Sequence, residues 1–465
     1  MSFSSRLVHG LCGVVIASSS AAAGGFSTAR FGGERGHAAT DNLTAIYYNP
    51  AGLAFGKGTR GLIEGMFALR TVDYDRDPGA IDNPGTNTPD EATSANAGPA
   101  HLTNFIASPF LGFATDAGVK GLGIGVGVYV PFGGQASWDQ NDAYEGNTTY
   151  PGAVDGPQRW SAIEGEQRSL YATLAVAYRH ASGKFGMGVG FNLVQNTVSL
   201  VRARNANGTD DQVVGGAIAE GRSLLEVDNL EPAASIGVMV KPTPCSRIGL
   251  SYQSQPNFGE SRLSGTLTNK FGQTAPAATE VELTQSLPDV IRLGFEWRAF
   301  TRGSIHIGAD YQRWSSYDNQ CIIAGASAGA KCAINADGSS SEAGVILNLP
   351  RRWKDTYGVR AGGRWFPTDT LEVNGGVSFD SNAVPDDTID PSLFDMNKVI
   401  GQAGVAWTHA SVNLSLSLAH VYYIERTTAP RAGGVDPAPP SRNPDMAGTY
   451  ASQVTFAILG VGVAM

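Results

Sequence analysis

Residues 185–193 read FGMGVGFNL, so that a large apolar side chain alternates with glycine or asparagine. In an extended strand, successive side chains point to opposite faces. This segment therefore presents one apolar face and one face of small or polar groups. Residues 122–128 (LGIGVGV) and 412–418 (VNLSLSL) repeat the pattern. The repetition predicts an all-β protein built from two-faced strands.

The same alternation recurs along most of the chain. We expect about fourteen strands, at residues 59–75, 100–115, 118–132, 167–181, 183–203, 227–242, 245–261, 280–299, 302–319, 353–367, 369–381, 397–409, 411–426 and 450–465. Many exceed the five or six residues usual in soluble sheets. A tilted strand that crosses a membrane needs about 9–11 residues. The pattern therefore predicts a transmembrane antiparallel β-barrel.

The connections between these strands alternate in length. Short turns at 180–183, 241–244 and 367–369 contrast with much longer segments that are rich in Gly, Pro, Asn, Asp and Ser. We interpret the longer segments as loops at 133–166, 204–226, 262–279, 320–352, 382–396 and 427–449. Membrane barrels have short periplasmic turns and long extracellular loops, which is the arrangement expected here.

Aromatic residues lie near many of the expected strand ends, as they do in the interfacial girdles of membrane barrels. The residues assigned to such girdles are Trp297, Trp314, Tyr317, Trp353, Trp365, Phe366, Tyr422 and Tyr423. Ordinary packing of aromatic side chains in a core is the alternative.

The N-terminus has the order of a secretory signal. Arg6 precedes an apolar run at 7–17, and Ala21-Ala22-Ala23 supplies small residues for cleavage. We therefore expect residues 1–23 to be a signal peptide, 24–57 to form a separate N-terminal segment and 58–465 to form the barrel. Beyond the signal, the sequence contains no uncharged apolar run of about 18 residues, the length of a spanning helix.

Composition narrows the class of protein further. The chain has 465 residues, 59 of them glycine, and only 16% are charged. Glycine weakens helix interiors, but it suits close backbone approach in a barrel. The formal net charge of -9 argues against nucleic acid as a partner.

Several sequence blocks together resemble the FadL/TodX family of outer-membrane transporters of hydrophobic compounds. Gly25-Phe26 follows the expected cleavage site, and the N-terminal segment ends with Asn49-Pro50-Ala51. Further blocks occur in the family's order: 287–297 (LPDVIRLGFEW), 310–317 (DYQRWSSY), 353–357 (WKDTY) and 375–381 (GGVSFDS), followed by Val384-Pro385. The chain departs from such barrels at its C-terminus, where Met465 stands in place of an aromatic residue.

The resemblance implies a monomeric fourteen-stranded barrel in the outer membrane of a Gram-negative bacterium, with residues 24–57 as a hatch inside the lumen. It implies a passive channel without cofactor or catalysis, surrounded by outer-membrane lipids. In the family, a hydrophobic ligand binds in the lumen and leaves sideways through the wall beside a kinked strand. Asn49, Pro50 and Ala51 would lie near that kink. Long-chain fatty acids are the favoured substrate; aromatic hydrocarbons and a general diffusion porin are the alternatives.

A carboxylate ligand would need a basic group at the end of an apolar pocket. Arg168, Arg292 and Arg360 are candidates, although each could instead form an ion pair in the lumen. Cys321 and Cys332 bracket part of one expected loop in an oxidising compartment and are predicted to form a disulfide.

Two further patterns have weaker functional readings. Residues 325–329 match Gly-x-Ser-x-Gly, but they lie in a small-residue loop without the strand and helix that a nucleophile elbow requires. The acidic residues of segment 382–396 could bind Ca²⁺, although a solvated acidic loop is the simpler interpretation.

Overall fold

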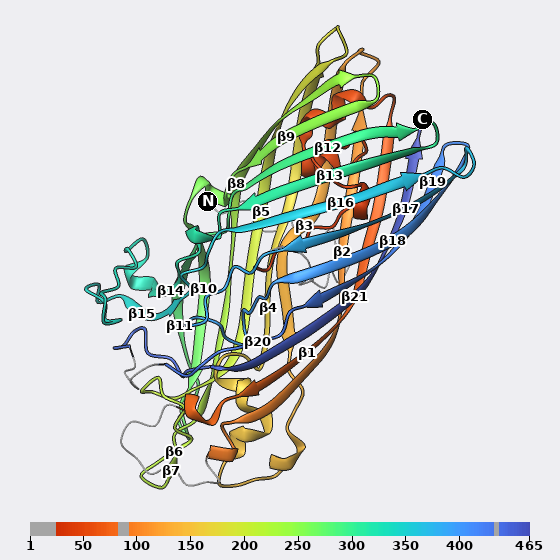
Figure 1. Ribbon diagram of the computed structural model, residues 1–465. Helices are drawn as coiled ribbons and strands as arrows, with labels where there is room; N and C mark the ends of the chain where they lie inside the picture. The colour runs from red at the N-terminus through yellow and green to blue at the C-terminus, as the bar shows by residue number, and fades with distance from the viewer. Residues whose placement is uncertain (1–24, 82–92, 432–436) are drawn as a thin grey trace.

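Fourteen antiparallel strands form a closed barrel in the computed structural model, which describes residues 25–81, 93–431 and 437–465. The wall strands are β1 (Arg60–Arg76), β2 (Gly98–Thr115), β3 (Leu122–Ser137), β4 (Glu164–Arg179), β5 (Phe185–Arg204), β8 (Gly221–Thr243), β9 (Ser246–Gln253), β12 (Val290–Phe300), β13 (Gly303–Gln312), β16 (Thr356–Trp365), β17 (Leu371–Asp380), β18 (Lys398–His409), β19 (Val412–Tyr423) and β21 (Gly448–Ala464). Figure 1 shows them inclined around one lumen. The predicted fold class is confirmed; the expected signal at 1–23 lies outside the described residues.

The barrel closes between its first and last strands. β1 pairs with β21 in an unbroken register from Arg60↔Ala464 to Arg76↔Gly448. The alternation seen in the sequence separates the two faces of the wall. On β5, Met187, Val189 and Phe191 are exposed on the outer face, while Gly188 between them is buried on the lumenal face. This division matches a wall with lipid outside and packed side chains inside.

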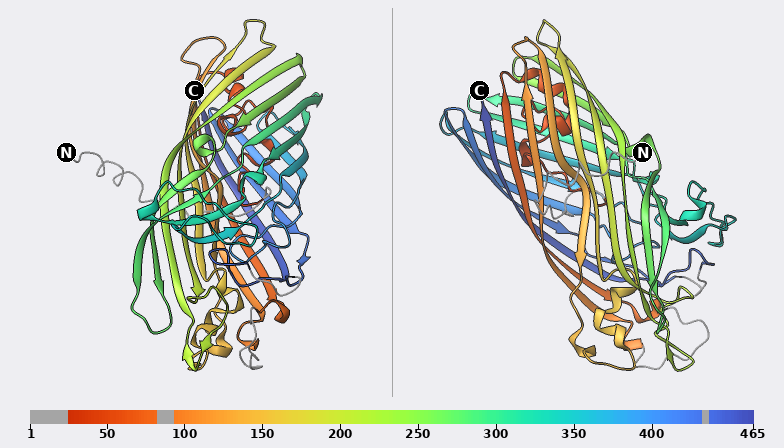
Figure 2. Two further views of the ribbon diagram at one scale, coloured as in Figure 1. Left: turned by 90° about the vertical axis from the view of Figure 1, so that its left-hand side faces the viewer. Right: turned by 180° about the vertical axis from the view of Figure 1, so that it is seen from behind.

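The loop end of the barrel carries a lateral extension of the sheet. β8 pairs with β9 along one part of its length and with β10 (Ser261–Lys270) along another, and β11 (Ala277–Gln285), β14 (Asn319–Ala324) and β15 (Val345–Pro350) follow in order. Figure 2 shows this extension standing away from the barrel. The loops expected at 262–279 and 320–352 thus contain strands. Their polar composition concealed Leu263, Leu267 and Leu347, which are buried in one apolar cluster.

Short elements complete the described chain. Two small strand pairings involve β6 (Val213–Val214) with β7 (Ala217–Ile218), and β20 (Arg426–Thr427) with β21. The helical turns are η1 (Gly33–Arg35), α1 (Ala45–Tyr48), η2 (Pro50–Phe55), η3 (Pro78–Ala80), η4 (Asp142–Tyr144), η5 (Pro151–Asp155), η6 (Pro157–Trp160), η7 (Pro256–Phe258), η8 (Trp314–Ser316) and η9 (Gly325–Ser327). Within the described ranges, every helix is too short or too polar to cross a bilayer.

Residues 25–57 lie inside the lumen and contain η1, α1 and η2 (Figure 1). We call this segment the hatch. Carboxylates on the wall bind it at several points along its length. Asp380 forms a buried ion pair of 2.5 Å with Arg30. Glu64 accepts a hydrogen bond of 2.7 Å from the Gly32 N–H. Such charge-assisted contacts are stronger than neutral hydrogen bonds, so the hatch is fixed at defined points.

Glycines on the lumenal face allow the hatch backbone to approach the wall. Gly188 of β5 is paired with Gly237 of β8, and a Cβ on either would lie within 2.6 Å of the hatch motif at residues 49–51. Gly249 of β9 is paired with Gly294 of β12, and together they make room for the backbone of Ala38 and Ala39. The alternating glycines of the sequence therefore mark the places where the wall contacts the hatch.

Candidate functional site: a lumenal chamber beside a break in the wall

The hydrogen-bond ladder between β2 and β3 is interrupted part of the way along the wall. The two strands pair from Thr115↔Ile124 to Phe110↔Tyr129, and the described pairing stops there although both strands continue. On its other side, β3 shifts register against β4 between Tyr129 and Phe132. Pro131 lies within this bulge. Proline has no N–H to donate to a ladder and is found at edges and bulges of sheets, which explains the break at this residue.

The hatch takes the place of β2 beside the bulge. The Thr28 N–H donates to the Pro131 carbonyl at 2.8 Å, and the Gly133 N–H donates to the Phe26 carbonyl at 3.0 Å. Farther along, the Asn104 side chain donates to the Gln135 carbonyl at 3.0 Å. The break between β2 and β3 is therefore bounded by a strand pair at one end and by a side-chain bridge at the other, with the hatch behind it.

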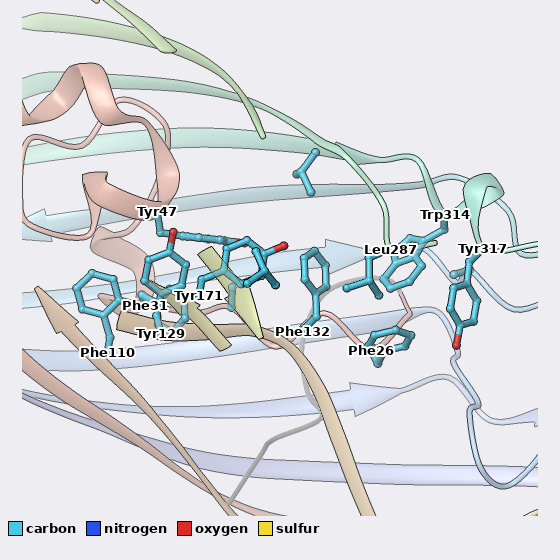
Figure 3. Close-up of a cluster of buried hydrophobic side chains, with 14 of the residues drawn as sticks. Phe26, Phe31, Tyr47, Phe110, Tyr129, Phe132, Tyr171, Leu287, Trp314 and Tyr317 are labelled. Atoms are coloured by element: carbon cyan, nitrogen blue, oxygen red, sulfur yellow. The ribbon is translucent and has the colours of Figure 1, made fainter. Parts of the chain in front are cut away.

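A column of buried aromatic side chains fills the lumen next to the break (Figure 3). Phe26 contacts Trp314 with ring centroids 4.8 Å apart, and it contacts Tyr317 and Trp353 at 5.7 Å. Trp314, Tyr317 and Trp353 are at most 3% exposed. The expectation that these three belong to an interfacial girdle is wrong. They follow or precede wall strands in the sequence, but the chain there turns inward and packs against the hatch.

The column continues on the other side of Phe132 towards α1. Phe31 lies 5.0 Å from Phe110 and 5.1 Å from Tyr47, and Tyr47 lies 5.4 Å from Tyr129. The girdle assignment does fit Trp297, Trp365 and Tyr422, which are exposed on the outside of the barrel. The lumen thus contains a continuous series of packed aromatic side chains alongside the hatch.

A chamber of about 80 Å³ adjoins the start of the hatch. Its lining includes Phe26, residues 134–136 of β3, residues 391–395 and the side chains of Arg70 and Arg351. Its apolar lining includes Val198, Leu200, Leu393 and Phe394. Since β3 residues 134–136 follow the bulge directly, the chamber lies beside the break between β2 and β3.

The two arginines of the chamber are held differently. The Arg70 guanidinium lies over the Phe394 ring, 4.9 Å from its centroid. Arg351 forms an ion pair of 2.6 Å with Asp390 and donates to Gln320. Burial by itself raises the pKa of the Asp390 carboxyl, but Arg351 and hydrogen bonds from Ser392 and Ser161 outweigh burial and hold that pKa below its usual value.

The three arginines predicted from the sequence are dispersed. Arg360 forms an ion pair of 2.5 Å with Asp310. The Arg292 guanidinium donates to Gln253 at 3.2 Å and lies 4.2 Å from the centroid of the Tyr47 ring. Arg168 lies 3.7 Å from the carboxylate of Glu166. Glu166 and Gln167 line the chamber, but Arg168 does not. The structure therefore gives Arg70 and Arg351, which the sequence interpretation missed, the more direct position in the chamber.

Asn49, Pro50 and Ala51 are completely or almost completely buried, but they lie against β5 and β8 rather than at the β3 bulge. The Asn49 side chain donates to the Val238 carbonyl at 3.0 Å and to the Ala38 carbonyl at 2.7 Å, and it accepts from the Ala51 N–H. The motif thus ties two parts of the hatch to the wall. The bulge of β3 contacts Phe26 and Thr28 of the hatch, and β3 meets the hatch again where Gly123 faces Leu53 and Ala54. The role of the motif beside a kinked strand stays a prediction.

The remaining sequence candidates lie at the loop end. Cys321 and Cys332 are joined by a disulfide within the lateral extension, and Cys245 is exposed at the opposite end. In the acidic segment 382–396, Asp387 and Asp395 form ion pairs with Arg352 and Lys398. The described residues contain no group of three or more His, Cys, Asp or Glu side chains that could hold a metal ion. The Gly-x-Ser-x-Gly match at 325–329 includes the single turn η9.

Comparisons with known proteins agree with this architecture. The family model for outer membrane protein transport proteins (OMPP1/FadL/TodX) matches residues 13–434. The long-chain fatty acid transport protein of Escherichia coli K12 is 22% identical over 313 residues, which span 60% of this chain and 64% of that protein.

Solved structures share the fold at low sequence identity. A Pseudomonas aeruginosa FadL homologue is 15% identical and superposes with a TM-score of 0.74 over 96% of this chain and 100% of its own. The Ralstonia pickettii toluene transporter TbuX is 16% identical, with a TM-score of 0.62 over 95% of this chain and 99% of its own.

Proposed function

Because the chain belongs to the outer membrane protein transport family (OMPP1/FadL/TodX), we propose that it is a passive channel for the uptake of hydrophobic molecules. The family consists of transport channels of the outer membrane of Gram-negative bacteria, and the recognition made from the sequence is confirmed. The observation that carries the proposal is the position of the chamber, whose lining includes β3 immediately beyond its bulge. A ligand in the chamber would have a short path to the break in the wall.

The proposed route begins at the loop end and leaves through the wall. A hydrophobic molecule enters the chamber beside Phe26, moves along the aromatic column and passes between β2 and β3 into the bilayer. Lateral exit suits such a ligand, because passage into lipid avoids transfer of apolar surface into water. The hatch supports this route by filling the lumen that an aqueous pore would need. We expect a monomer, since the wall is closed without a second copy.

Within this class, we propose long-chain fatty acids as the substrates. The guanidiniums of Arg70 and Arg351 lie at a chamber with apolar walls, and a carboxylate is the group that a guanidinium binds best. A neutral aromatic hydrocarbon could make only a cation–π contact with these arginines, which is weaker than an ion pair with a carboxylate. The relatives include a fatty acid transport protein and a toluene transporter, so the charged lining is what favours the acid.

The exit is tested by narrowing the break with a large side chain. Ala107 and Ala457 both pair with Phe67, one from each side of β1, and both lie on the outer face of the wall. Ala107 is on the part of β2 that has no described partner on β3, whereas Ala457 is in a continuous ladder. Ala107→Trp is expected to slow uptake of labelled oleate, and Ala457→Trp is the matched control. Equal uptake by the two folded variants would contradict lateral exit.

The substrate is tested at Arg70. Arg70→Gln is expected to lower the uptake of oleate about tenfold, the effect of losing one hydrogen bond to a charged group. Uptake of toluene should fall much less, because toluene can make only a cation–π contact with Arg70. An equal loss for both compounds would contradict a carboxylate-binding role. Rapid permeation of sugars into proteoliposomes would favour a general porin instead.

The hatch motif is tested by Asn49→Ala combined with Pro50→Ala. We propose that the motif supports transport by holding the hatch against β5 and β8. The double variant should therefore fold as a barrel, with heat-modifiable migration on gels, but transfer substrate more slowly. Normal uptake by a well-folded double variant would remove this role.

A further inference from the structure

Two histidine rings meet where the hatch packs against β13. The His37 ring of the hatch stacks on the His306 ring of β13, with centroids 4.8 Å apart and ring planes inclined by 15°. Both side chains are buried, with 3% of His37 and 0% of His306 exposed. The stack therefore joins the hatch to the wall at a place that is shielded from bulk water while the hatch is docked.

The surrounding backbone confines both rings. The Ala39 N–H donates to Nδ1 of His37 at 3.2 Å. Gly294 of β12 makes room for this part of the hatch, since a Cβ there would lie 2.6 Å from the Ala39 nitrogen. His306 is paired with Gly362 of β16, where a Cβ would lie 2.6 Å from Nε2 of the His306 ring. Because the wall confines His306, repulsion between the two rings is relieved most directly by movement of the hatch.

Ion pairs surround the stack on the lumenal face. Glu296 of β12 lies opposite His306 and 3.5 Å from Nε2 of His37. The charged groups that face the rings from the adjoining elements form the pairs Arg247 (β9) with Glu296 and with Asp41 of the hatch, Arg364 (β16) with Glu296, and Arg360 (β16) with Asp310 (β13), and Lys241 of β8 lines one cavity with Asp41. Each of these three carboxylates already has an arginine partner, so their charge is largely compensated before either ring takes up a proton.

Protonation of the rings opposes docking of the hatch. Burial holds the pKa of His37 well below its usual value, and positive charge on His306, Arg364, Arg247 and Arg360 adds to this effect. In an undocked hatch the ring is hydrated and its pKa returns to about 6.5. Because the pKa is lowered in the docked state, docking is fully stable above about pH 6.5 and loses stability as the pH falls below that value. Two imidazoliums at stacking distance also repel each other.

We propose that the stack of His37 on His306 is a pH-sensitive latch, which holds the hatch against β13 in neutral medium and releases it in acid. The start of the hatch has separate anchors, because Arg30 is bound to Asp380 and the Gly32 N–H to Glu64. Release therefore moves the part of the hatch around His37 and opens the lumen transiently. The latch requires that the hatch fills the lumen, and it does not depend on which substrate the channel carries.

Single-channel recordings of the purified protein in planar bilayers test the latch. Between pH 7.5 and 5.5, the ratio of open to closed channels should rise about tenfold if one ring takes up a proton on release, and about hundredfold if both do. Hydrogen exchange of residues 36–41, corrected for the intrinsic pH dependence of exchange, should rise over the same range. An opening ratio that does not change between these two pH values would overturn the proposal.

Neutral substitutions assign the pH dependence to the stack. His37→Gln can still accept from the Ala39 N–H but cannot become charged, so the rise in the opening ratio should be about tenfold smaller than in the parent protein if both rings take up a proton, and absent if only His37 does. The double variant with His306→Gln should show no rise. His420→Gln is the matched control, because His420 is an exposed histidine of β19 whose ring contacts Thr455; it should respond to pH as the parent protein does. The same response in the double variant and in the parent would overturn the latch.

A permanent charge separates electrostatics from packing. His306→Lys should open frequently at pH 7.5 as well as at pH 5.5, whereas His306→Gln should stay closed at pH 7.5. If His306→Gln opens as often as His306→Lys at pH 7.5, the stack acts by packing alone and the latch is overturned. These measurements use no hydrophobic substrate, so failure of the latch would leave the proposed uptake channel standing, and failure of oleate uptake would leave the latch standing.

Discussion

Replacing Gly249 by alanine should detach part of the hatch from the wall. A Cβ at this position would lie 1.9 Å from the Ala38 carbonyl oxygen and 2.5 Å from its carbon. That carbonyl cannot yield alone, because it accepts the Asn49 hydrogen bond at 2.7 Å. The hatch would have to move as a unit, and overpacking of this kind costs about 1–3 kcal/mol. The undocked population should rise by about 5- to 150-fold.

Gly401→Ala is the matched control for this prediction. Gly401 is also a glycine within a wall strand, but a Cβ there would have no atom within 4 Å. We expect Gly249→Ala to show frequent transient openings in single-channel recordings and faster proteolysis within residues 25–57, and we expect Gly401→Ala to behave as the parent protein does. If both variants have the same opening frequency and the same proteolysis rate, the wall glycines do not position the hatch by close approach.

Three further predictions concern the hatch and the loop end. Deleting residues 25–57 should raise ion conductance, since the lumen would lose its filling; unchanged conductance would refute a plugging role. The contribution of Asp390 to the free energy of unfolding should be complete above about pH 3.8 and should fall as the pH drops through the lowered pKa of the folded state. Protection of segment 382–396 from protease should therefore decrease in acid. Asp390→Asn should abolish this pH dependence. The native protein should contain no free thiol at Cys321 or Cys332, and Cys321→Ser with Cys332→Ser should lower the stability of the lateral extension by roughly 2–3 kcal/mol, measured by hydrogen exchange.

The wall could be predicted from the sequence because its physics is local. Each strand must place apolar groups towards lipid and small or polar groups towards the lumen. This requirement produces an alternation of apolar and small or polar residues, as in 185–193. The same phase places Arg70 on the lumenal face of β1, together with Met66 and Ala68. Extending the alternation one step further would therefore have identified Arg70 as a lumen residue.

The chamber and the lateral extension depend on contacts between distant segments. Trp314 and Trp353 lie next to strand ends in the sequence. Their inward direction is seen only from their contacts with Phe26, which is distant in the sequence. Arg351 lies outside any alternating segment, so no local signal indicates its direction. β10 is rich in Ser, Thr and Gly, and it is a strand because β8 and β11 flank it. These features depend on contacts between segments that are far apart in the chain, and a single sequence does not predict such contacts.

The seam between β1 and β21 has a consequence for biogenesis. The barrel cannot close until its last strand, β21, has been synthesised and paired with β1. The hatch also needs partners from late in the chain. Arg30 binds Asp380, 350 residues later, and the Gly25 N–H donates to Asp395, 370 residues later. Contacts of this separation form only after the loop-closure entropy has been overcome. A chain interrupted before these residues would hold neither a sealed wall nor a seated hatch. Closure of the wall and docking of the hatch thus both require strands from the two ends of the barrel. A fragment that lacks the last strands could not form a selective channel.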